Sequence, residues 1–199
     1  MDLLLASASP ARRATLRAAG IDPTVAVSSV DEPAVLAAAG PVPPAEAVLV
    51  LARAKARDIA AGHPDALVLG CDSMLELDGQ VLGKPRDAAD AVERWRAMRG
   101  RSAVLHSGHW LIDGSSEHGA TSSTTVHFAQ VSDAEIDAYV ATGEPLHVAG
   151  AFTIDGLGGP FVTGIEGDHH GVVGLSLPLL RELLSRVGLS ITDLWNTGA

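Results

Sequence analysis

The segment LLASASPARRATL, residues 4–16, joins a short apolar run to a predicted helix. The run Leu3–Ala6 has the length and apolar character of a buried strand. Ser9 stands at the position of a helix N-cap, Pro10 follows at the first helical position, and Gly20 ends the helix. The chain is therefore expected to open with a buried strand, a tight turn and a helix of about ten residues.

Two arginines, Arg12 and Arg13, fall in the first turn of this helix, where the helix dipole disfavours cations. An anion bound at the helix N-terminus would explain both guanidinium groups and the neighbouring hydroxyls of Ser7 and Ser9. A polyphosphate suits this arrangement. The alternative is a basic, solvated helix start that binds nothing.

Length and composition limit the fold and the class of partner. The chain has 199 residues, of which 47% are hydrophobic and 19% charged, as in globular proteins. This length suits one domain, residues 1–199, whose core can be divided between two lobes. The net charge of −10 argues against broad nucleic-acid binding, which needs a basic surface. An acidic chain that binds polyphosphate must therefore concentrate positive charge locally or use a metal.

Cysteine usage and hydropathy predict a cytoplasmic protein. Cys71 is the only cysteine, so no disulfide can form within the chain, and a reducing compartment fits. The N-terminal segment lacks the basic region and the long apolar run of a signal peptide. No apolar run approaches the roughly 20 residues of a membrane span. We therefore expect no membrane association.

Charged residues follow the predicted strand 25–30 and lie on the predicted helix 44–61. Asp31 and Glu32 come after the strand, and their adjacent carboxylates either hold a hard cation or lie solvated in a turn. Lys55 borders the apolar face of the helix. This lysine either reaches inward to a site or extends to water, and the spacing alone favours neither.

A predicted hairpin carries the next candidates. Asp78-Gly79 between two short apolar runs is a strong hairpin signal. The buried strand 66–69 leads to Asp72, which is thus expected at a strand end just before the hairpin. Catalytic carboxylates of α/β proteins often lie at strand ends. Lys84, held between a glycine and a proline after the hairpin, could place a point charge against a phosphate.

The rest of the chain mixes strands and helices without a regular β-α-β repeat. The predicted elements are a helix 87–99, strands 103–112 and 121–131 joined by a polar loop, a helix 132–142, a strand 161–166 and a helix 178–187. The segment 143–159 is rich in glycine, which indicates close backbone packing or a loop that wraps a ligand. Asp168, His169 and His170, in a predicted loop, either ligate a metal or are ordinary polar residues. The mixture predicts an α/β or α+β fold with a mixed sheet.

Four blocks of sequence, taken together, resemble the Maf family, the septum-formation-inhibitor-like nucleoside triphosphate pyrophosphatases. The blocks follow one another in the family's order and, with the Asp31-Glu32 acids and the Lys55 helix, span nearly the whole chain. They are LASASPARRATL (5–16), LGCDSMLELDGQVLGKP (69–85), GEPLHVAGAFTIDGLGGPFV (143–162) and GVVGLSLPLLRELL (171–184).

The resemblance implies an α/β fold in which a mixed, twisted sheet with flanking helices forms two lobes around a central cleft, as in Maf and inosine-triphosphate pyrophosphatase proteins. It implies hydrolysis of a nucleoside triphosphate to the monophosphate and pyrophosphate with a divalent cation, Mg²⁺ or Mn²⁺. Such a protein would be a house-cleaning enzyme of nucleotide metabolism and often a homodimer. The alternative is a nucleotide- or partner-binding regulator of cell division with little catalysis.

The resemblance also assigns roles to residues, most of which the chemistry had already singled out. The family's catalytic aspartate falls on Asp72, which would activate the attacking water or hold the metal that does so, with Glu32 as a second carboxylate ligand. Its phosphate-binding residues fall on Ser9, Arg12, Arg13, Lys55 and Lys84.

Base recognition is where the sequence departs from the family's pyrimidine-specific pattern. His147 and Val148 replace an Asp-Lys pair, and Asp155 replaces a glutamine. This combination resembles the subgroup acting on 7-methyl-GTP, although Ile154 and the glycines at 156–159 resemble the pyrimidine type. An ionised Asp155 can accept from both N–H groups of a guanine edge, whereas uracil and thymine would present an oxygen to it. We therefore expect 7-methyl-GTP or GTP-like substrates over UTP and dTTP; the alternative is that Asp155 faces solvent and recognises nothing.

Overall fold

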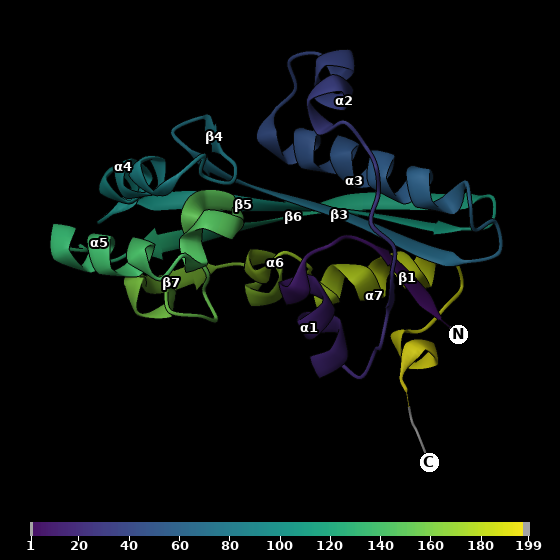
Figure 1. Ribbon diagram of the computed structural model, residues 1–199. Coiled ribbons are helices and arrows are strands. Elements are labelled where there is room, and N and C mark those ends of the chain that lie inside the picture. Colours follow the sequence, from purple (N-terminus) through teal and green to yellow (C-terminus); the bar gives the residue numbers. More distant parts are fainter. Residues whose placement is uncertain (1, 197–199) are drawn as a thin grey trace.

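The computed structural model describes residues 2–196 as a seven-stranded sheet with helices on both faces (Figure 1). The strands are β1 (Leu3–Ala6), β2 (Thr24–Val25), β3 (Leu67–Leu77), β4 (Gln80–Leu82), β5 (Ser102–Asp113), β6 (Ser116–Phe128) and β7 (Val162–Glu166). The α-helices are α1 (Pro10–Ala18), α2 (Glu32–Ala39), α3 (Pro44–Ala60), α4 (Ala88–Met98), α5 (Asp133–Ala141), α6 (His169–Val173) and α7 (Leu177–Arg186). Short 3-10 helices are η1 (Glu144–His147), η2 (Ala149–Ala151), η3 (Gly159–Phe161) and η4 (Ile191–Leu194).

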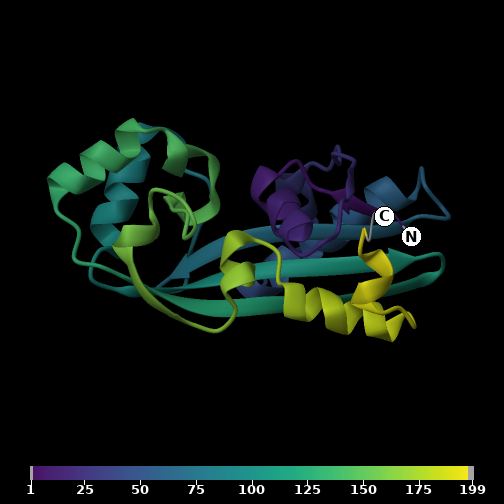
Figure 2. The ribbon, with the colours of Figure 1, turned by 90° about the horizontal axis from the view of Figure 1, so that it is seen from below.

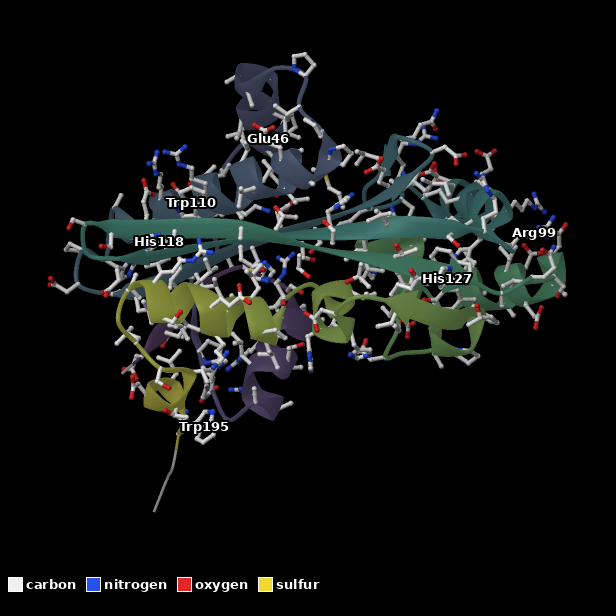
Figure 3. The ribbon with its side chains drawn as sticks, turned by 180° about the vertical axis from the view of Figure 1, so that it is seen from behind. Glu46, Arg99, Trp110, His118, His127 and Trp195 are labelled. Atoms are coloured by element: carbon white, nitrogen blue, oxygen red, sulfur yellow. The ribbon has the colours of Figure 1, made fainter. Side chains whose placement is uncertain are left out.

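The sheet is mixed, as predicted. Its strand order is β2-β1-β3-β5-β6-β7, and β4 pairs with β3 outside this path. β1 is parallel to β2 and β3, whereas the other pairs are antiparallel. The long strands β3, β5 and β6 run through both ends of the molecule (Figure 2). Figure 3 shows the length of β6, whose residues His118 and His127 lie at opposite ends of the sheet.

One edge of β3 is shared by two strands that leave a gap between them. β1 pairs with Leu67–Gly70, and β4 pairs with Leu75–Leu77. Within residues 2–196 no strand covers residues 71–74 on this side, and we call them the open edge of β3. Because β1 ends opposite Gly70, the turn from β1 into α1 arrives beside the open edge.

Helix α3 lies directly on one face of the sheet because two glycines let it approach. A Cβ at Gly70 of β3 would lie 2.2 Å from the carbonyl oxygen of Ala52, and one at Gly108 of β5 would lie 2.4 Å from that of Val48. Any side chain at these positions would push the helix away. This contact brings Lys55, on the same helix, down to the sheet. Helices α1, α6 and α7 lie on the opposite face (Figure 1).

Hydrophobic clusters divide the core between two lobes. The small lobe contains α4, α5, β4, β7 and the 3-10 helices η1–η3, and its cluster surrounds Trp95. The Trp95 ring makes edge-to-face contacts with Phe128, Tyr139 and Phe161. The large lobe contains β1, β2, α1–α3, α6 and α7; its clusters lie between the sheet and α7 and beneath α3. The predicted two-lobed α/β fold is thus confirmed.

The structure corrects the predicted place of Asp72. β3 is one continuous strand, so the prediction that Asp72 ends a strand is wrong. Its pairing with β5 continues through the site, with Asp72 opposite Gly108. The strand therefore holds Asp72 rigidly at mid-length, and the open edge replaces the expected strand end.

Three predicted loops or turns are regular structure instead. Glu32 begins α2 rather than a turn, because the Asp31 side chain caps the helix at the N–H of Ala34. The predicted polar loop after 112 belongs to the hairpin of β5 and β6, whose pairing continues to Asp113 and Ser116. His169 begins α6, which Asp168 caps through the N–H groups of His170 and Gly171.

Candidate active site

The N-terminus of α1 forms one side of a cavity of about 400 Å³. Ser9 caps the helix, as predicted, by accepting a hydrogen bond from the backbone N–H of Arg12. Arg13 is exposed and lines the cavity together with Ser7, Ser9 and Arg17. The cavity therefore combines a helix N-terminus with guanidinium groups and hydroxyls, which suits an anion.

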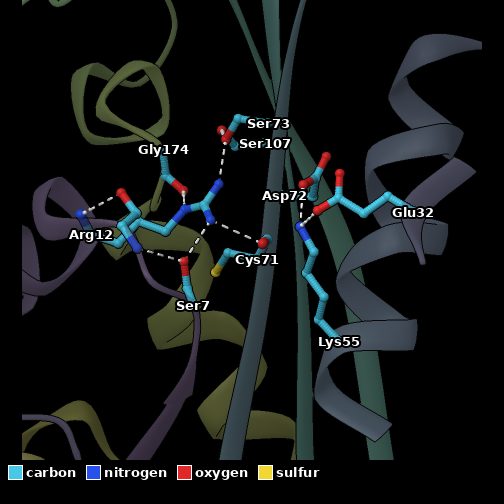
Figure 4. A network of polar contacts seen from close by, with 10 residues as sticks. Ser7, Arg12, Glu32, Lys55, Cys71, Asp72, Ser73, Ser107 and Gly174 are labelled. Atoms are coloured by element: carbon cyan, nitrogen blue, oxygen red, sulfur yellow. Dashed lines mark hydrogen bonds and ion pairs between the residues drawn. The ribbon is translucent and has the colours of Figure 1, made fainter. Parts of the chain in front are cut away.

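The side chain of Arg12 turns inward, away from the cavity that Arg13 lines. Its Nη1 donates to Ser7 Oγ (2.9 Å) and to the carbonyl oxygen of Cys71 (3.0 Å). Its Nη2 donates to Ser73 Oγ (3.0 Å), and its Nε donates to the carbonyl oxygen of Gly174 (2.8 Å). Arg12 thus connects the turn after β1, the open edge of β3 and the end of α6 (Figure 4). Most of its N–H groups are used within the protein, so a phosphate role for Arg12 stays a prediction.

On the other face of β3, three charged side chains meet at one point (Figure 4). The Nζ of Lys55 lies 2.6 Å from Asp72 Oδ1 and 2.7 Å from Glu32 Oε1. Lys55 and Asp72 have side chains only 12% exposed, whereas that of Glu32 is 49% exposed. One ammonium therefore holds together two carboxylates, one buried and one at the surface.

Burial sets the protonation of Asp72. It raises the pKa of this carboxyl above its usual value, although the positive charges of Lys55 and Arg12 oppose the shift. The direction of the shift suits a group that must accept a proton near neutral pH. The alternation of side chains along β3 places Asp72 on the α3 face and its neighbours Cys71 and Ser73 on the α1 face.

Lys84 follows β4, which pairs with β3 immediately beyond the open edge. Its side chain is exposed. The backbone before it is held firmly, because the carbonyl oxygen of Gly83 accepts from Arg94 Nη1 (2.5 Å) and from the N–H of Gly150 (3.1 Å). The backbone that carries the lysine is thus held in place, and its ammonium group is exposed on the small-lobe side of the site.

The residues predicted to recognise a base lie in the small lobe. Asp155 is exposed on the loop Phe152–Gly158, called the glycine loop here, and lines a second cavity of about 300 Å³. The same cavity is lined by α1 of the large lobe and by His169 and His170 of α6. His147 on η1 is also exposed, but it does not line this cavity. The structure thus brings Asp155, and not His147, to a cavity between the lobes.

Metal ligation by the trio Asp168, His169 and His170 was one of two predicted interpretations. Within the described chain no group of three or more His, Cys, Asp or Glu side chains is arranged to hold a metal ion. The carboxylate of Asp168 caps α6 instead. The two carboxylates beside Lys55 remain as the candidate metal ligands.

The sequence interpretation missed the polar network behind Arg12. Ser73 Oγ lies 2.7 Å from Ser107 Oγ, and Ser107 donates to the carbonyl oxygen of Gly171 (2.8 Å). His109 on the same strand is buried, and its Nε2 accepts from the N–H of Ser176 (2.8 Å). The available signal was the presence of Ser73 in β3 and of Ser107 and His109 in β5, polar residues within otherwise largely apolar strands.

Nothing in residues 2–196 forms a helix with the length and apolar character needed to cross a membrane.

Comparison with known proteins identifies the family. The model of the family described as Maf-like protein matches residues 2–187. A protein of Salinispora tropica named nucleoside triphosphate pyrophosphatase is 61% identical, over 98% of this chain and 88% of its own. Proteins of the same name from Streptomyces coelicolor and Mycobacterium ulcerans are 58% and 50% identical, over 97% of this chain and 94% and 96% of theirs.

A solved structure from Mycobacterium abscessus, described as a nucleoside-triphosphatase / dITP/XTP pyrophosphatase, is a distant match. It aligns over 94% of both chains with 16% identity and a TM-score of 0.44, so it carries no weight beside the sequence relatives. The family model covers nearly the whole chain and includes the α1 cavity, the Lys55 cluster and the glycine loop. The chain therefore belongs to the Maf family.

Proposed function

We propose that this chain hydrolyses nucleoside triphosphates to the nucleoside monophosphate and pyrophosphate. The family and the names of relatives at 50–61% identity support this activity. The observation that carries it is the position of Asp72, a buried carboxylate with a raised pKa, paired with Lys55 at the open edge of β3. The free, buried thiol of Cys71 is compatible with a reducing cytoplasm, which is where we place the activity.

The triphosphate is assigned to the side of the open edge where α1 begins. The helix N-terminus, the Ser9 hydroxyl and the exposed guanidinium of Arg13 would bind phosphate oxygens. Lys84 would reach the chain of phosphates from the small lobe, and Lys55 from the α3 face. Arg12 is assigned mainly to holding the turn after β1 in place, since its guanidinium is bonded to Ser7 and Ser73.

A divalent cation fits the donors that the chain presents. Asp72 and Glu32 offer carboxylate oxygens that already converge on one positive charge, the Nζ of Lys55. Mg²⁺ is usually held by one or two carboxylates together with substrate phosphates and water, so two carboxylates suffice. Asp72 and Glu32 would hold the ion, which would supply Lewis-acid polarisation of the phosphate oxygens.

The residues of the chain divide the chemistry between them. A water molecule attacks the α-phosphorus, the bond to the oxygen bridging the α- and β-phosphates breaks, and pyrophosphate leaves. Asp72 either takes the proton of the water on Oδ2, the oxygen that Lys55 leaves free, or holds the ion that would activate this water. Lys55, Arg13 and Lys84 neutralise the charge that develops on the leaving pyrophosphate.

We propose further that Asp155 selects the base. Its exposed carboxylate lines the cavity between the lobes, where it can accept two hydrogen bonds from a guanine edge. A positive charge on a 7-methylated guanine would add attraction. The preferred substrates are then 7-methyl-GTP or GTP-like nucleotides over UTP and dTTP. Asp155→Gln should shift the ranking toward the pyrimidine nucleotides, as measured by kcat/KM for the four nucleotides.

The deciding experiment measures pyrophosphate release from a panel of nucleoside triphosphates with Mg²⁺ or Mn²⁺, in wild type and in Asp72→Asn. This substitution keeps the shape of the side chain, so the melting temperature should hold while turnover is nearly abolished. Activity of Asp72→Asn within a few-fold of wild type would refute the assignment of Asp72. Tight nucleotide binding without turnover in wild type would favour the alternative of a regulator of cell division.

A further inference from the structure

The glycine loop is folded around a single carboxylate, that of Glu144. Glu144 Oε1 accepts from Tyr139 Oη (2.9 Å) and from the N–H of Gly158 (3.2 Å). Glu144 Oε2 accepts from the N–H of Leu157 (3.1 Å), and the hydroxyl of Thr153 donates to Oε1 as well. One side chain thus satisfies two backbone N–H groups and two hydroxyls.

Two glycines show how closely the loop encloses this carboxylate. A Cβ at Gly156 would lie 2.8 Å from Glu144 Oε2, and a Cβ at Gly158 would lie 2.6 Å from Tyr139 Oη. Neither position accepts a side chain unless the loop moves. The glycine-rich composition predicted either close backbone packing or a loop around a ligand. In this segment the backbone packs closely around a carboxylate of the same chain.

The protonation states match the hydrogen bonds. Burial raises the pKa of the Glu144 carboxyl, but the bonds from Thr153, Leu157, Tyr139 and Gly158 outweigh it, and the pKa lies below its usual value. Burial raises the pKa of Tyr139 to about 12, so its hydroxyl keeps the proton that it donates. Glu144 is therefore an ionised acceptor at neutral pH.

The position of Asp155 follows from these contacts. Asp155 lies between Thr153 and Leu157, which are both bonded to Glu144, while its own side chain is exposed at the cavity between the lobes. We propose that Glu144 is a positioning residue for nucleotide specificity: its carboxylate fixes the glycine loop so that Asp155 meets the N–H groups of a purine base. This inference rests on the proposed function.

The test compares Glu144→Gln, Asp155→Ala and the double variant by steady-state kinetics with GTP and UTP. Glutamine replaces one acceptor oxygen with an NH₂ group that faces the donors of the loop. KM for the preferred nucleotide should rise about tenfold while kcat stays within about twofold. In Glu144→Gln, the ratio of kcat/KM for GTP to kcat/KM for UTP should fall to the value of Asp155→Ala. The double variant should have a ratio no lower than that of either single variant.

Glu135→Gln is the matched control. The Glu135 carboxylate also lies in the small lobe and accepts a backbone N–H, that of Ser132 (2.8 Å), but it caps α5 and does not contact the glycine loop. The nucleotide ratio of this variant should equal that of wild type. A purely structural role of Glu144 would lower stability without changing the ratio.

The outcomes separate this inference from the proposed function. If Glu144→Gln keeps the wild-type ratio while Asp155→Ala loses it, the positioning role is wrong and the enzyme assignment stands. If Glu144→Gln does not fold, Thr153→Val, which loses one donor, should lower the ratio, whereas Thr153→Ser should retain it; equal ratios overturn the proposal. If wild type releases no pyrophosphate, the proposed function is wrong. The role of Glu144 is then tested by the dissociation constants of GTP and UTP, and equal affinity of wild type for the two nucleotides would overturn it.

Discussion

Arg12 and Arg13 are adjacent in the sequence, but their side chains lie in different environments. Arg12 and Arg13 have the same chemistry and stand in the same turn of α1, about 100° apart around the helix axis. Arg12 is buried and bonded to Ser7, Ser73 and two carbonyl groups, whereas Arg13 is exposed at the cavity. We therefore expect substitutions at the two positions to damage different properties.

Arg12→Gln should lower the free energy of unfolding by at least about 3 kcal/mol, because it leaves several buried acceptors without a charged donor. Arg13→Ala should change stability by no more than about 0.5 kcal/mol, yet reduce kcat/KM about ten- to a hundredfold. Lys84→Ala should resemble Arg13→Ala. Urea unfolding and pyrophosphate release measure the two properties. Equal stability of Arg12→Gln and Arg13→Ala would contradict this division.

His109 makes the stability of the protein depend on pH. Burial and the charge of Arg12 lower its pKa from 6.5 to about 4, so the folded state keeps the ring neutral. Below pH 6.5 the His109 ring binds a proton in the unfolded chain, whereas in the folded chain it stays neutral down to about pH 4. Lowering the pH between these values therefore favours the unfolded state. The loss amounts to about 3 kcal/mol between these limits.

His109→Gln should remove this part of the pH dependence. A glutamine can donate to the carbonyl oxygen of Ser107 and accept from the N–H of Ser176, as the histidine does. Urea unfolding of both proteins at several values between pH 7 and pH 4 measures the difference in slope. His147→Gln, on an exposed histidine, is the control and should follow wild type. Parallel curves for wild type and His109→Gln would disprove the role of His109.

At the scale of elements, the contact of α3 with the sheet decides where Lys55 lies. The helix has no side-chain cap at its start, and its position depends on the backbone contacts at Gly70 and Gly108. These contacts place Lys55 against Asp72, which belongs to a different element 17 residues away. A small displacement of α3 would separate the ammonium from the carboxylate.

Gly108→Ala should therefore reduce both stability and activity. The added Cβ would meet the backbone of Val48, which cannot move without moving α3, and such overpacking costs about 1–3 kcal/mol. We expect kcat to fall with it because Lys55 leaves Asp72. Gly62→Ala is the control, since the nearest atom to its Cβ is 3.9 Å away. Thermal unfolding and turnover of both variants test this, and wild-type values for Gly108→Ala would show that α3 adjusts freely.

At the scale of the whole molecule, the two lobes share the strands β3, β5 and β6. The small-lobe cluster includes Leu75, Leu105 and Val126 from these strands, and the large-lobe cluster includes Leu69 and Leu111 from two of them. A substitution that destabilises one hydrophobic cluster should therefore destabilise the other as well, because both pack on the same hydrogen-bonded strands. A single domain over residues 1–199, as predicted, should unfold in one step.

Trp95→Ala tests this cooperativity. Trp95 is fully buried in the small lobe, and its Nε1 donates to the carbonyl oxygen of Ala151 (2.8 Å), so the substitution should cost about 3–5 kcal/mol. We expect hydrogen exchange to accelerate in α7 of the large lobe as well as in α5 of the small lobe. Faster exchange confined to the small lobe, or two separate thermal transitions, would show that the lobes unfold independently.

Local interactions explain what could be predicted from the sequence alone. The N-cap at Ser9, the hairpin at Asp78-Gly79 and the capping box that begins at Ser132 depend on residues within a few positions of one another. The same holds for the candidate residues Arg13, Asp72 and Lys84, whose charge beside a turn or a strand is visible in the chain. The mixed sheet followed from the irregular succession of predicted strands and helices, and the two lobes around a cleft followed from the resemblance of four blocks to one family.

Contacts between residues far apart in the sequence decided the features that could not be predicted from it. Asp72 lies in the middle of a strand because β5 pairs with β3 beyond it, and the open edge exists because β1 and β4 pair with separate parts of β3. Arg12 turns inward because its acceptors, among them Ser73 and Gly174, come from distant segments. Glu144 likewise acquires its role only when the chain returns to it at Leu157. A carboxylate or guanidinium has the same local signature whether it faces solvent, substrate or its own chain, and only the folded backbone distinguishes these cases.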